Sequence, residues 1–540
     1  MLELKSKKYV KENKADFEKA GIYVPSYDTD SLYKKTFEAP VWIHFGSGNL
    51  FKAFHCVLAQ DMIEKAGFDK GIIVAETFGY DMINKVYKLY DNLVLQVVMK
   101  ADGNIKPQIV SSVTEAIAAD SSDKTAWDRM KEIFANPSLQ MASFSITEKG
   151  YDLKTLDGSF KPEVIKEFES GISAPSHAML KLTALMFERY KKGKYPIALV
   201  STDNFSHNGD KLKAAVLAVA NEWKKRGHTE QGFIDYLSEP KKTAFPWSMI
   251  DKITPYPAPK VQEQLKELGL GKAAELIPVG DNMFSAVFVN TEEAQYLVIE
   301  DSFPNGRPPL EKAGVYFTNR ETVDKVEKMK VCTCLNPLHT VLAIFGCILG
   351  FKSISAEVRD EDLFKMVNKV GYDEGMPVVV DPAIIKPADF IKEVLTVRFP
   401  NPNIPDTPQR IATDTSQKLG IRFGETIKLY GEKGLDINKL VFIPLAIAGW
   451  CRYLLALDDE GKPFTPSPDP LLKEAQALLK GIEFGKPQTA DGKLKEILSN
   501  TKIFGSDLYK AGLGERIEMY FKEMIAGAGA VRKTIKKYLA

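Results

Sequence analysis

One short segment of the chain holds three residue types that together could move a proton: Lys330, Asn336 and His339. Asn336 and His339 are three residues apart, so on a helix they share one face. Oxidation of an alcohol needs a base for the hydroxyl proton, and a partly desolvated lysine can serve because burial lowers its pKa. Neutral amides can stabilise an oxyanion. Taken without other information, the three residues fit better a solvated lysine, a capping asparagine and a core histidine.

A glycine-rich turn is the second chemically suggestive feature. Gly46 and Gly48 match the first two positions of the dinucleotide-binding pattern G-x-G-x-x-G, whereas Phe51 replaces the third glycine. Glycine lets the backbone approach a pyrophosphate at a helix N-terminus, and Asn49 belongs to the same turn. A plain strand-to-helix turn is the alternative interpretation.

An acidic residue, Glu76, ends the next apolar run after this turn. A carboxylate there could accept hydrogen bonds from a ribose diol and repel a 2′-phosphate, which favours NAD over NADP. A solvated strand end explains the same residue equally well.

The elements around the turn predict a βαβ unit: a strand at 41–45, a helix at 50–67 and a strand at 71–76. Further strands are predicted by apolar runs, several of them separated by helical patterns, at 93–99, 141–147, 197–202, 286–290 and 296–301. Alternation of strands and helices is typical of an α/β domain with a parallel sheet.

After about residue 320 helical periodicity dominates, interrupted by a proline-rich segment at 399–409. We therefore predict a lead-in at 1–40, an α/β domain at 41–318 and a mainly α-helical domain at 319–540. Two domains also suit a chain of 540 residues.

The composition argues against several classes of partner. The 72 basic and 71 acidic residues give a net charge of +1, which offers no reason to expect nucleic acid or an anionic membrane. The first 20 residues are charged and lack an apolar signal core, and the longest apolar stretch, 340–351, is too short to span a bilayer. We expect a soluble, cytoplasmic protein.

No metal site is expected either. The five cysteines are odd in number and scattered, and Cys332 and Cys334 form a C-x-C pair without a second pair. The six histidines contain no H-x-x-x-H pair, so a catalytic zinc is disfavoured.

Seven motifs, in order over about residues 40–430, resemble the polyol-specific long-chain dehydrogenases and reductases, the mannitol dehydrogenase family. They are HFGSGNLFKAF (44–54), SITEKGY (145–151), STDNFSHNG (201–209), MIDKITP (249–255), VIEDSFPNGRPPLEKAGV (298–315), CLNPLH (334–339) and RIATDTSQK (410–418). The resemblance implies an N-terminal Rossmann-type domain, a largely helical C-terminal domain and an active site between them. It also implies NAD(P) as cofactor, without a metal.

The resemblance also assigns roles to single residues. It implies that Lys330 is the general acid/base, that Asn204 and Asn336 form the oxyanion hole, and that His339 orients the reactive oxygen. Asp251 would then contact substrate hydroxyls.

Two further basic residues, Arg410 and Lys418, are implied to bind the distal end of the substrate. They are eight residues apart here, as in the family. They could hold a carboxylate by charge-assisted hydrogen bonds or hold hydroxyls, since polyol-specific members keep both.

The chain departs from the family pattern K-x(4)-N-x(2)-H at one point. Lys330 stands six residues before Asn336, where the pattern requires five, and Val331 occupies the expected position. Either the backbone is irregular before the helix or another lysine acts. Lys328 is the alternative, since eleven residues before His339 on a straight helix it would lie on nearly the same face. We favour Lys330.

The glycine turn resembles that of the uronate reductases more than that of the mannitol enzymes, with Lys52 where those usually have arginine. The resemblance therefore implies NADH-linked reduction of D-fructuronate to D-mannonate. A monomer and a weak homodimer are both expected as possible assemblies. Tagaturonate reduction and mannitol oxidation are alternatives. A catalytically inactive NAD-binding scaffold is an alternative of another class, motivated by the displaced lysine.

Overall fold

The computed structural model describes residues 2–155 and 157–540. The chain divides into two compact units. Unit 1 comprises Met1–Lys100 and Asn104–Asp324, and unit 2 comprises Ala101–Gly103 and Lys325–Ala540.

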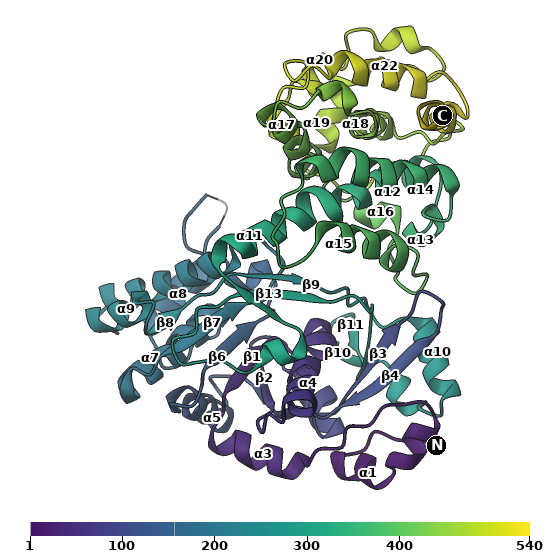
Figure 1. Ribbon diagram of the computed structural model, residues 1–540. Coiled ribbons are helices and arrows are strands. Elements are labelled where there is room, and N and C mark those ends of the chain that lie inside the picture. Colours follow the sequence, from purple (N-terminus) through teal and green to yellow (C-terminus); the bar gives the residue numbers. More distant parts are fainter. Residues whose placement is uncertain (1, 156) are drawn as a thin grey trace. The chain divides into compact units, whose positions relative to one another are not determined.

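The centre of unit 1 is a six-stranded sheet in the order β5-β2-β1-β6-β7-β8, in which every neighbouring pair is parallel (Figure 1). Its strands are β1 (Trp42–Phe45), β2 (Ile72–Glu76), β5 (Val113–Ala118), β6 (Met141–Phe144), β7 (Ile197–Ser201) and β8 (Thr243–Ala244). The chain reverses its direction of winding between β1 and β6. This is the order of a doubly wound dinucleotide-binding sheet, and it confirms the predicted Rossmann-type fold.

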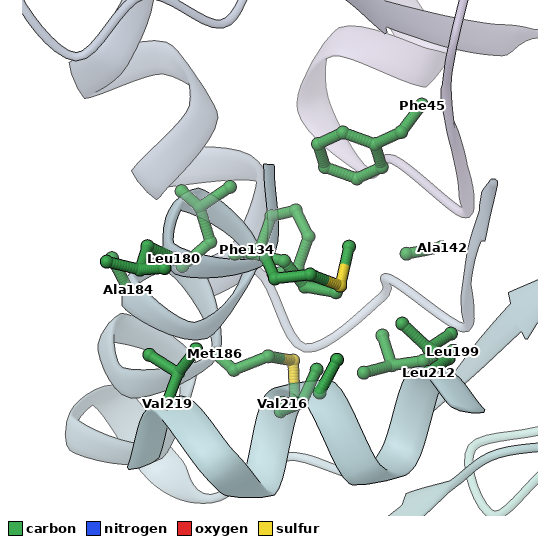
Figure 2. Close-up of a cluster of buried hydrophobic side chains, with 14 of the residues drawn as sticks. Phe45, Phe134, Ala142, Leu180, Ala184, Met186, Leu199, Leu212, Val216 and Val219 are labelled. Carbon is green, nitrogen blue, oxygen red and sulfur yellow. The ribbon is translucent and has the colours of Figure 1, made fainter. Parts of the chain in front are cut away.

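Strand β1 is buried on both faces, because helices cover both sides of the sheet. Ile43 and Phe45 belong to one apolar cluster, which they share with α5 (Lys124–Ala135), α7 (Ala178–Gly193) and α8 (Asn208–Lys225). Figure 2 shows Phe45 in this cluster beside side chains from these helices.

The opposite face of the same sheet packs against α4 (Cys56–Ala66). Trp42 of β1 and Val74 of β2 belong to this second cluster. Side chains along a strand alternate between faces, so a continuous apolar run such as 41–45 supplies both cores at once.

Three smaller sheets complete unit 1. The predicted strands at 93–99, 286–290 and 296–301 exist, but they lie in these smaller sheets and not in the main one. Their orders are β12-β3-β4, β14-β13-β9 and β10-β11. The strands are β3 (Val94–Met99), β4 (Ile105–Val110), β9 (Ser248–Asp251), β10 (Ile277–Gly280), β11 (Met283–Ser285), β12 (Phe288–Thr291), β13 (Tyr296–Glu300) and β14 (Tyr316–Thr318).

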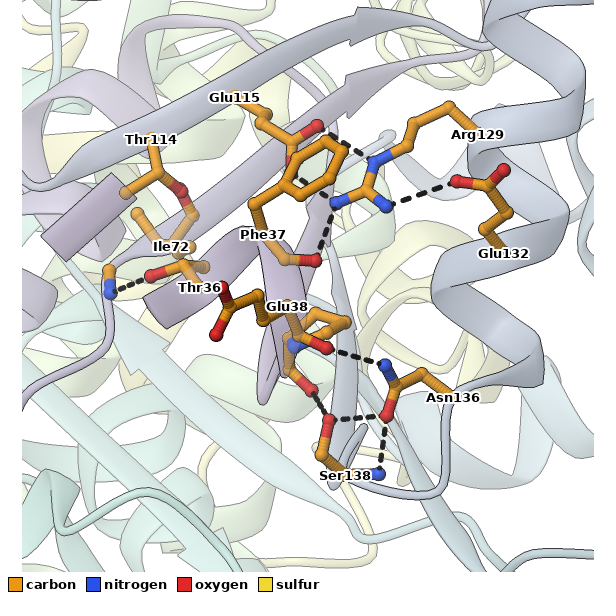
Figure 3. A network of polar contacts seen from close by, with 12 residues as sticks. Thr36, Phe37, Glu38, Ile72, Thr114, Glu115, Arg129, Glu132, Asn136 and Ser138 are labelled. Atoms are coloured by element: carbon orange, nitrogen blue, oxygen red, sulfur yellow. Dashed lines mark hydrogen bonds and ion pairs between the residues drawn. The ribbon is translucent and has the colours of Figure 1, made fainter. Parts of the chain in front are cut away.

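The lead-in forms α1 (Lys7–Glu12), α2 (Lys14–Lys19) and α3 (Thr29–Glu38). Arg129 of α5 binds Glu115 of β5 through two hydrogen bonds of 2.7 and 2.9 Å, and its guanidinium covers the ring of Phe37 (Figure 3). Asn136 donates to the carbonyl of Glu38 at 3.0 Å. These contacts attach the end of α3 to the sheet.

Unit 2 is built from helices, as predicted, since every named strand precedes residue 319. Two apolar helices, α12 (Asn336–Ile348) and α18 (Phe442–Tyr453), are buried over almost their whole length. Further α-helices of unit 2 are α15 (Pro387–Glu393), α16 (Pro408–Ile411), α17 (Glu425–Glu432), α22 (Gly514–Met524) and α23 (Ala530–Leu539).

The helical run Arg320–Ile348 has the length and apolar composition of a membrane span, the one such helix among residues 2–155 and 157–540. It is longer than the apolar stretch considered in the sequence. However, 83% of its apolar window is buried inside the protein. A buried core helix has the same composition, so this is weak evidence for a span.

Candidate functional site

The glycine turn lies at the carboxyl end of β1, beside the carboxyl end of β6. Gly46 has a φ of +107°, and a Cβ at this position would lie 2.2 Å from the carbonyl oxygen of Ser145. No atom lies within 4 Å of a Cβ at Gly48, so that position borders open space. Gly46 therefore permits the turn itself, and Gly48 leaves room beside it.

Glu76, at the end of β2, has its carboxylate bonded to this turn. Oε2 accepts hydrogen bonds from the backbone N–H and the hydroxyl of Ser47, at 2.9 and 2.6 Å. Oε1 accepts from the N–H groups of Thr77 at 2.9 Å and Phe78 at 3.3 Å. All four lone-pair positions of the carboxylate are thus used, so a ribose hydroxyl has to replace one of these donors.

Phe51 and Asn49 have structural contacts. Phe51 is fully buried at the start of a π-helix, Phe51–His55, and its ring stacks on His44 at a centroid distance of 5.1 Å. The phenyl ring thus fills the space next to β1 that a third glycine would leave open. Asn49 donates from Nδ2 to the carbonyl of Pro255 at 3.2 Å.

A cavity of about 450 Å³ opens at this edge of the sheet. The polar, glycine and aromatic residues that line it are suited to binding a dinucleotide. It borders Gly46, Gly48, Glu76, Thr77, Phe78, Ser145, Ile146, Thr147, Lys149, Gly150, Ser176, His177 and Ala178. Three of the predicted cofactor residues, Gly46, Gly48 and Glu76, therefore share one cavity. It lies where nucleotides bind such sheets, outside the strand ends at the reversal between β1 and β6.

In unit 2, Lys330 lies in a π-helix, Met329–Cys334, that leads into α12. The N–H of Leu335 bonds to the carbonyl of Lys330 at 3.1 Å, which closes a turn one residue wider than that of an α-helix. One extra residue before Asn336 is accommodated in this way. The irregular backbone that the sequence left open as an explanation is therefore present.

The two candidate lysines differ in their exposure. Lys330 is only 3% exposed, whereas Lys328 is an exposed residue. The π-helix packs against α12, α15 and α17 within unit 2. Of the two lysines, Lys330 is therefore the one that the protein shields from solvent.

His339 lies on α12 among charged groups of unit 2. Its Nε2 is 3.5 Å from Oδ2 of Asp406 and makes no hydrogen bond within the described part of the chain. Its ring lies 5.0 Å from that of Phe399, measured between centroids. Burial, and then nearby positive charges, lower its pKa to about 3, so the imidazole is neutral near pH 7.

Those positive charges belong to Arg422, Arg410, Arg398 and Lys418, which we call the cationic cluster. Arg410 pairs with Asp406, and Arg422 donates to the hydroxyl of Thr340 at 2.5 Å. Burial, followed by the charge of Arg422, lowers the pKa of Lys418. Thr340 in turn donates to the carbonyl of Asn336 at 2.9 Å, so Arg422 connects the cluster to the start of α12.

The structure thus brings Arg410 and Lys418 into the electrostatic surroundings of His339. Asn204, which follows β7 and is exposed, and Asp251, the last residue of β9, belong to unit 1. Their grouping with the residues of unit 2 stays a prediction.

Three residues with contacts in these regions were not predicted from the sequence: Ser47, Asp406 and Arg422. Ser47 lies between the two glycines that drew attention, and Arg422 follows Lys418 by one helical turn. Both signals were present, but serine and arginine are too common at such positions to be singled out. Asp406 lies in the proline-rich segment that was treated as an interruption.

No group of three or more histidine, cysteine, aspartate or glutamate side chains that could hold a metal ion occurs in residues 2–155 and 157–540. The five cysteines are free and buried.

Two family models match the chain: the mannitol dehydrogenase Rossmann domain at residues 41–312 and the mannitol dehydrogenase C-terminal domain at 322–525. The D-mannonate oxidoreductase of Thermotoga maritima is 52% identical over 97% of both chains. The D-mannonate oxidoreductase of Escherichia coli is 26% identical over 90% of this chain and 91% of the other.

Two solved structures share the fold. D-sorbitol dehydrogenase in substrate-free form has a TM-score of 0.78 at 23% identity, over 96% of this chain and 98% of that one. Pseudomonas fluorescens mannitol 2-dehydrogenase, in a ternary complex with NAD and D-mannitol, has a TM-score of 0.67 at 22% identity, over 96% and 97%.

Proposed function

Since the chain belongs to the mannitol dehydrogenase family, we propose that it is an NAD-dependent, metal-independent oxidoreductase of a sugar acid. The reaction is the reduction of D-fructuronate by NADH to D-mannonate and its reversal. The 52% identity to a D-mannonate oxidoreductase over nearly the whole chain supports mannonate as the alcohol.

The cationic cluster is the observation that favours an acid over a neutral polyol. Four positive side chains act on His339; Asp406 approaches its ring, and Asp414 and Asp469 act on Lys418. Collecting like charges is unfavourable unless a ligand or a neighbour supplies negative charge. A sugar carboxylate does so, and Arg410 and Lys418 can bind it by charge-assisted hydrogen bonds.

The cavity at the edge of the sheet is the proposed cofactor site. Gly46 and Gly48 leave the backbone accessible to a pyrophosphate, and Glu76 is placed to accept a ribose hydroxyl once Ser47 releases one of its hydrogen bonds. When bound, NADH supplies the hydride. A 2′-phosphate would meet the carboxylate of Glu76, which favours NAD over NADP.

Lys330 is the proposed general acid/base. In the direction of reduction, its ammonium Nζ gives a proton to the carbonyl oxygen as that oxygen becomes a hydroxyl. The side-chain amides of Asn336 and Asn204 stabilise the negative charge on this oxygen, and the neutral His339 orients it. In the direction of oxidation, the uncharged amine at Nζ takes the hydroxyl proton. Asp251 binds substrate hydroxyls.

We propose that the enzyme works in the cytoplasm as a monomer or weak homodimer. A net charge of +1 gives no general attraction to nucleic acid or anionic membranes.

A steady-state comparison of D-mannonate, D-altronate and D-mannitol with NAD⁺ tests the proposal. We expect mannonate to have the highest kcat/KM. If altronate wins, the enzyme is a tagaturonate reductase, and if mannitol wins, it is a mannitol 2-dehydrogenase and the cationic cluster has another role. NADH binding without turnover of any of the three would indicate a catalytically inactive scaffold.

A further inference from the structure

Phe78 follows Glu76 by two residues, and it is 85% exposed, the highest exposure among the large hydrophobic side chains of the described chain. We propose that its ring is the surface on which the adenine of the cofactor stacks, so that Phe78 determines affinity for the adenosine half. This inference rests on the proposed use of a dinucleotide, and it adds a residue and a role to it.

The position of Phe78 is the first argument. It lines the same cavity as Gly46, Gly48 and Glu76. A bound dinucleotide places pyrophosphate at the glycine turn, ribose at the acid that ends the second strand, and the base beyond the ribose. Phe78 therefore lies on the side of the ribose site where the adenine of the dinucleotide is expected.

The rigidity of the supporting backbone is the second argument. The N–H of Phe78 donates to Oε1 of Glu76 at 3.3 Å. The preceding carbonyl, that of Thr77, accepts a hydrogen bond of 2.8 Å from the ammonium of Lys181. Lys181 is 2% exposed and also donates to the hydroxyl of Tyr80 at 2.7 Å.

An exposed apolar ring on a backbone held from both sides is a costly arrangement for a free surface. One hydrogen bond to the carboxylate of Glu76 and one from the ammonium of Lys181 fix the segment, and yet the ring gains almost no burial. A ring held in place before binding loses little conformational freedom when a base stacks on it.

The other residues of the cavity offer no equivalent surface. Phe78 is the one hydrocarbon ring among the described residues that line it. His177 also lines it, but its Nδ1 accepts the N–H of Met179 at 3.2 Å and caps α7. Ile146 also lines it, but its side chain has no aromatic face; a base stacks on an aromatic ring, and Phe78 provides one.

The test is calorimetric titration of ADP-ribose and of reduced nicotinamide mononucleotide, which lacks adenine, into wild type and variants. We expect Phe78→Ala to weaken ADP-ribose binding about tenfold, within the range that base–aromatic stacking contributes. Binding of the mononucleotide should not change. Phe78→Trp should restore ADP-ribose affinity because it restores a stacking face.

Leu89→Ala is the matched control, since Leu89 is also exposed, at 62%, but does not line the cavity. It should bind both ligands like wild type. Equal ADP-ribose affinity of wild type and Phe78→Ala overturns the inference while leaving the cofactor assignment intact. Equal weakening of both ligands also overturns it, because the effect would then be on the fold of the site. A wild type that binds neither ligand overturns the cofactor assignment and the inference together.

Discussion

The glycine turn of unit 1 and the cationic cluster of unit 2 differ in how their polar and charged groups are hydrogen-bonded. At the turn, the carboxylate of Glu76 is saturated by four donors from its own chain. In the cluster, burial and then four nearby cations lower the pKa of His339, and Asp406 approaches the ring at 3.5 Å without forming a hydrogen bond. The carboxylate of Glu76 thus has its acceptor positions filled, whereas Nε2 of His339 makes no hydrogen bond within the described part of the chain.

The difference indicates how each region recognises its ligand. A saturated carboxylate holds the shape of a turn, and a ligand there is recognised by fit to the backbone and by exchange of single hydrogen bonds. A group of neighbouring positive side chains attracts an anion, so recognition there is electrostatic. Shape should therefore govern variants of the turn, and charge should govern variants of the cluster.

The largest effect should come from Lys330, which separates catalysis from cofactor binding. Lys330→Ala should lower kcat by about 10³-fold, within the range for loss of a general acid/base. NADH binding, followed by fluorescence quenching, should remain near wild type because the cofactor cavity is in unit 1. Lys328→Ala is the control and should keep most of its activity. The reverse ranking of the two variants would move the role to Lys328.

The two glycines should respond differently to the same added methyl group. Gly46→Ala combines a φ of +107° with a Cβ 2.2 Å from the carbonyl of Ser145, so it should lower folding stability by roughly 1–3 kcal/mol and weaken NADH binding. Gly48→Ala meets no atom within 4 Å, so its melting temperature should equal that of wild type.

Gly48→Ala should nevertheless weaken NADH binding, because its methyl group extends toward the open space that the cofactor needs. Melting temperatures and NADH titrations of both variants check this pair. A Gly48→Ala protein with wild-type NADH affinity would show that the pyrophosphate does not lie against this position.

Charge should matter more than hydrogen-bonding capacity at Arg410. Arg410→Gln keeps an amide donor and removes the charge, so kcat/KM for mannonate should fall about tenfold or more. The value for mannitol, which carries no charge, should change much less. Lys428→Gln, an exposed lysine on α17, is the control for removal of a positive charge. Equal losses for both substrates would mean that Arg410 binds hydroxyls.

Near neutral pH, the smallest effect is the pH dependence of stability at His339. Its pKa is about 3 in the folded state against an ordinary value of 6.5, so between these values the unfolded chain binds the proton. Wild type should therefore lose stability as the pH falls from 6.5 towards 3, by on the order of 1 kcal/mol per pH unit.

His339→Asn removes this contribution, and its melting temperature should fall less than that of wild type between pH 7 and pH 5. Burial also lowers the pKa of His44 and His55, but both proteins share these residues. Parallel pH profiles would indicate that His339 is accessible to protons in the folded protein.

The sequence predicted most of the fold because its patterns are local. The apolar run 41–45 predicted a strand that the structure has as β1. The run that ends at Glu76 predicted a second strand, which the structure has as β2. Sequence periodicity could not assign strands to sheets: the strand predicted at 93–99 belongs to a three-stranded sheet beside the main one. Strand β5, which pairs with β2 in the main sheet, was not predicted.

By itself, the sequence determined which chemistry the chain carries: a glycine turn before a helix, a lysine near an asparagine and a histidine, and two basic residues further on. These features depend only on residue type and spacing, so they can be read directly from the sequence. Only the tertiary structure decided three further points. A π-helix accommodates the extra residue between Lys330 and Asn336, Ser47 donates hydrogen bonds to the carboxylate of Glu76, and Arg422 belongs to the cationic cluster. Those facts depend on burial and on contacts between segments distant in the chain, and packing alone sets them.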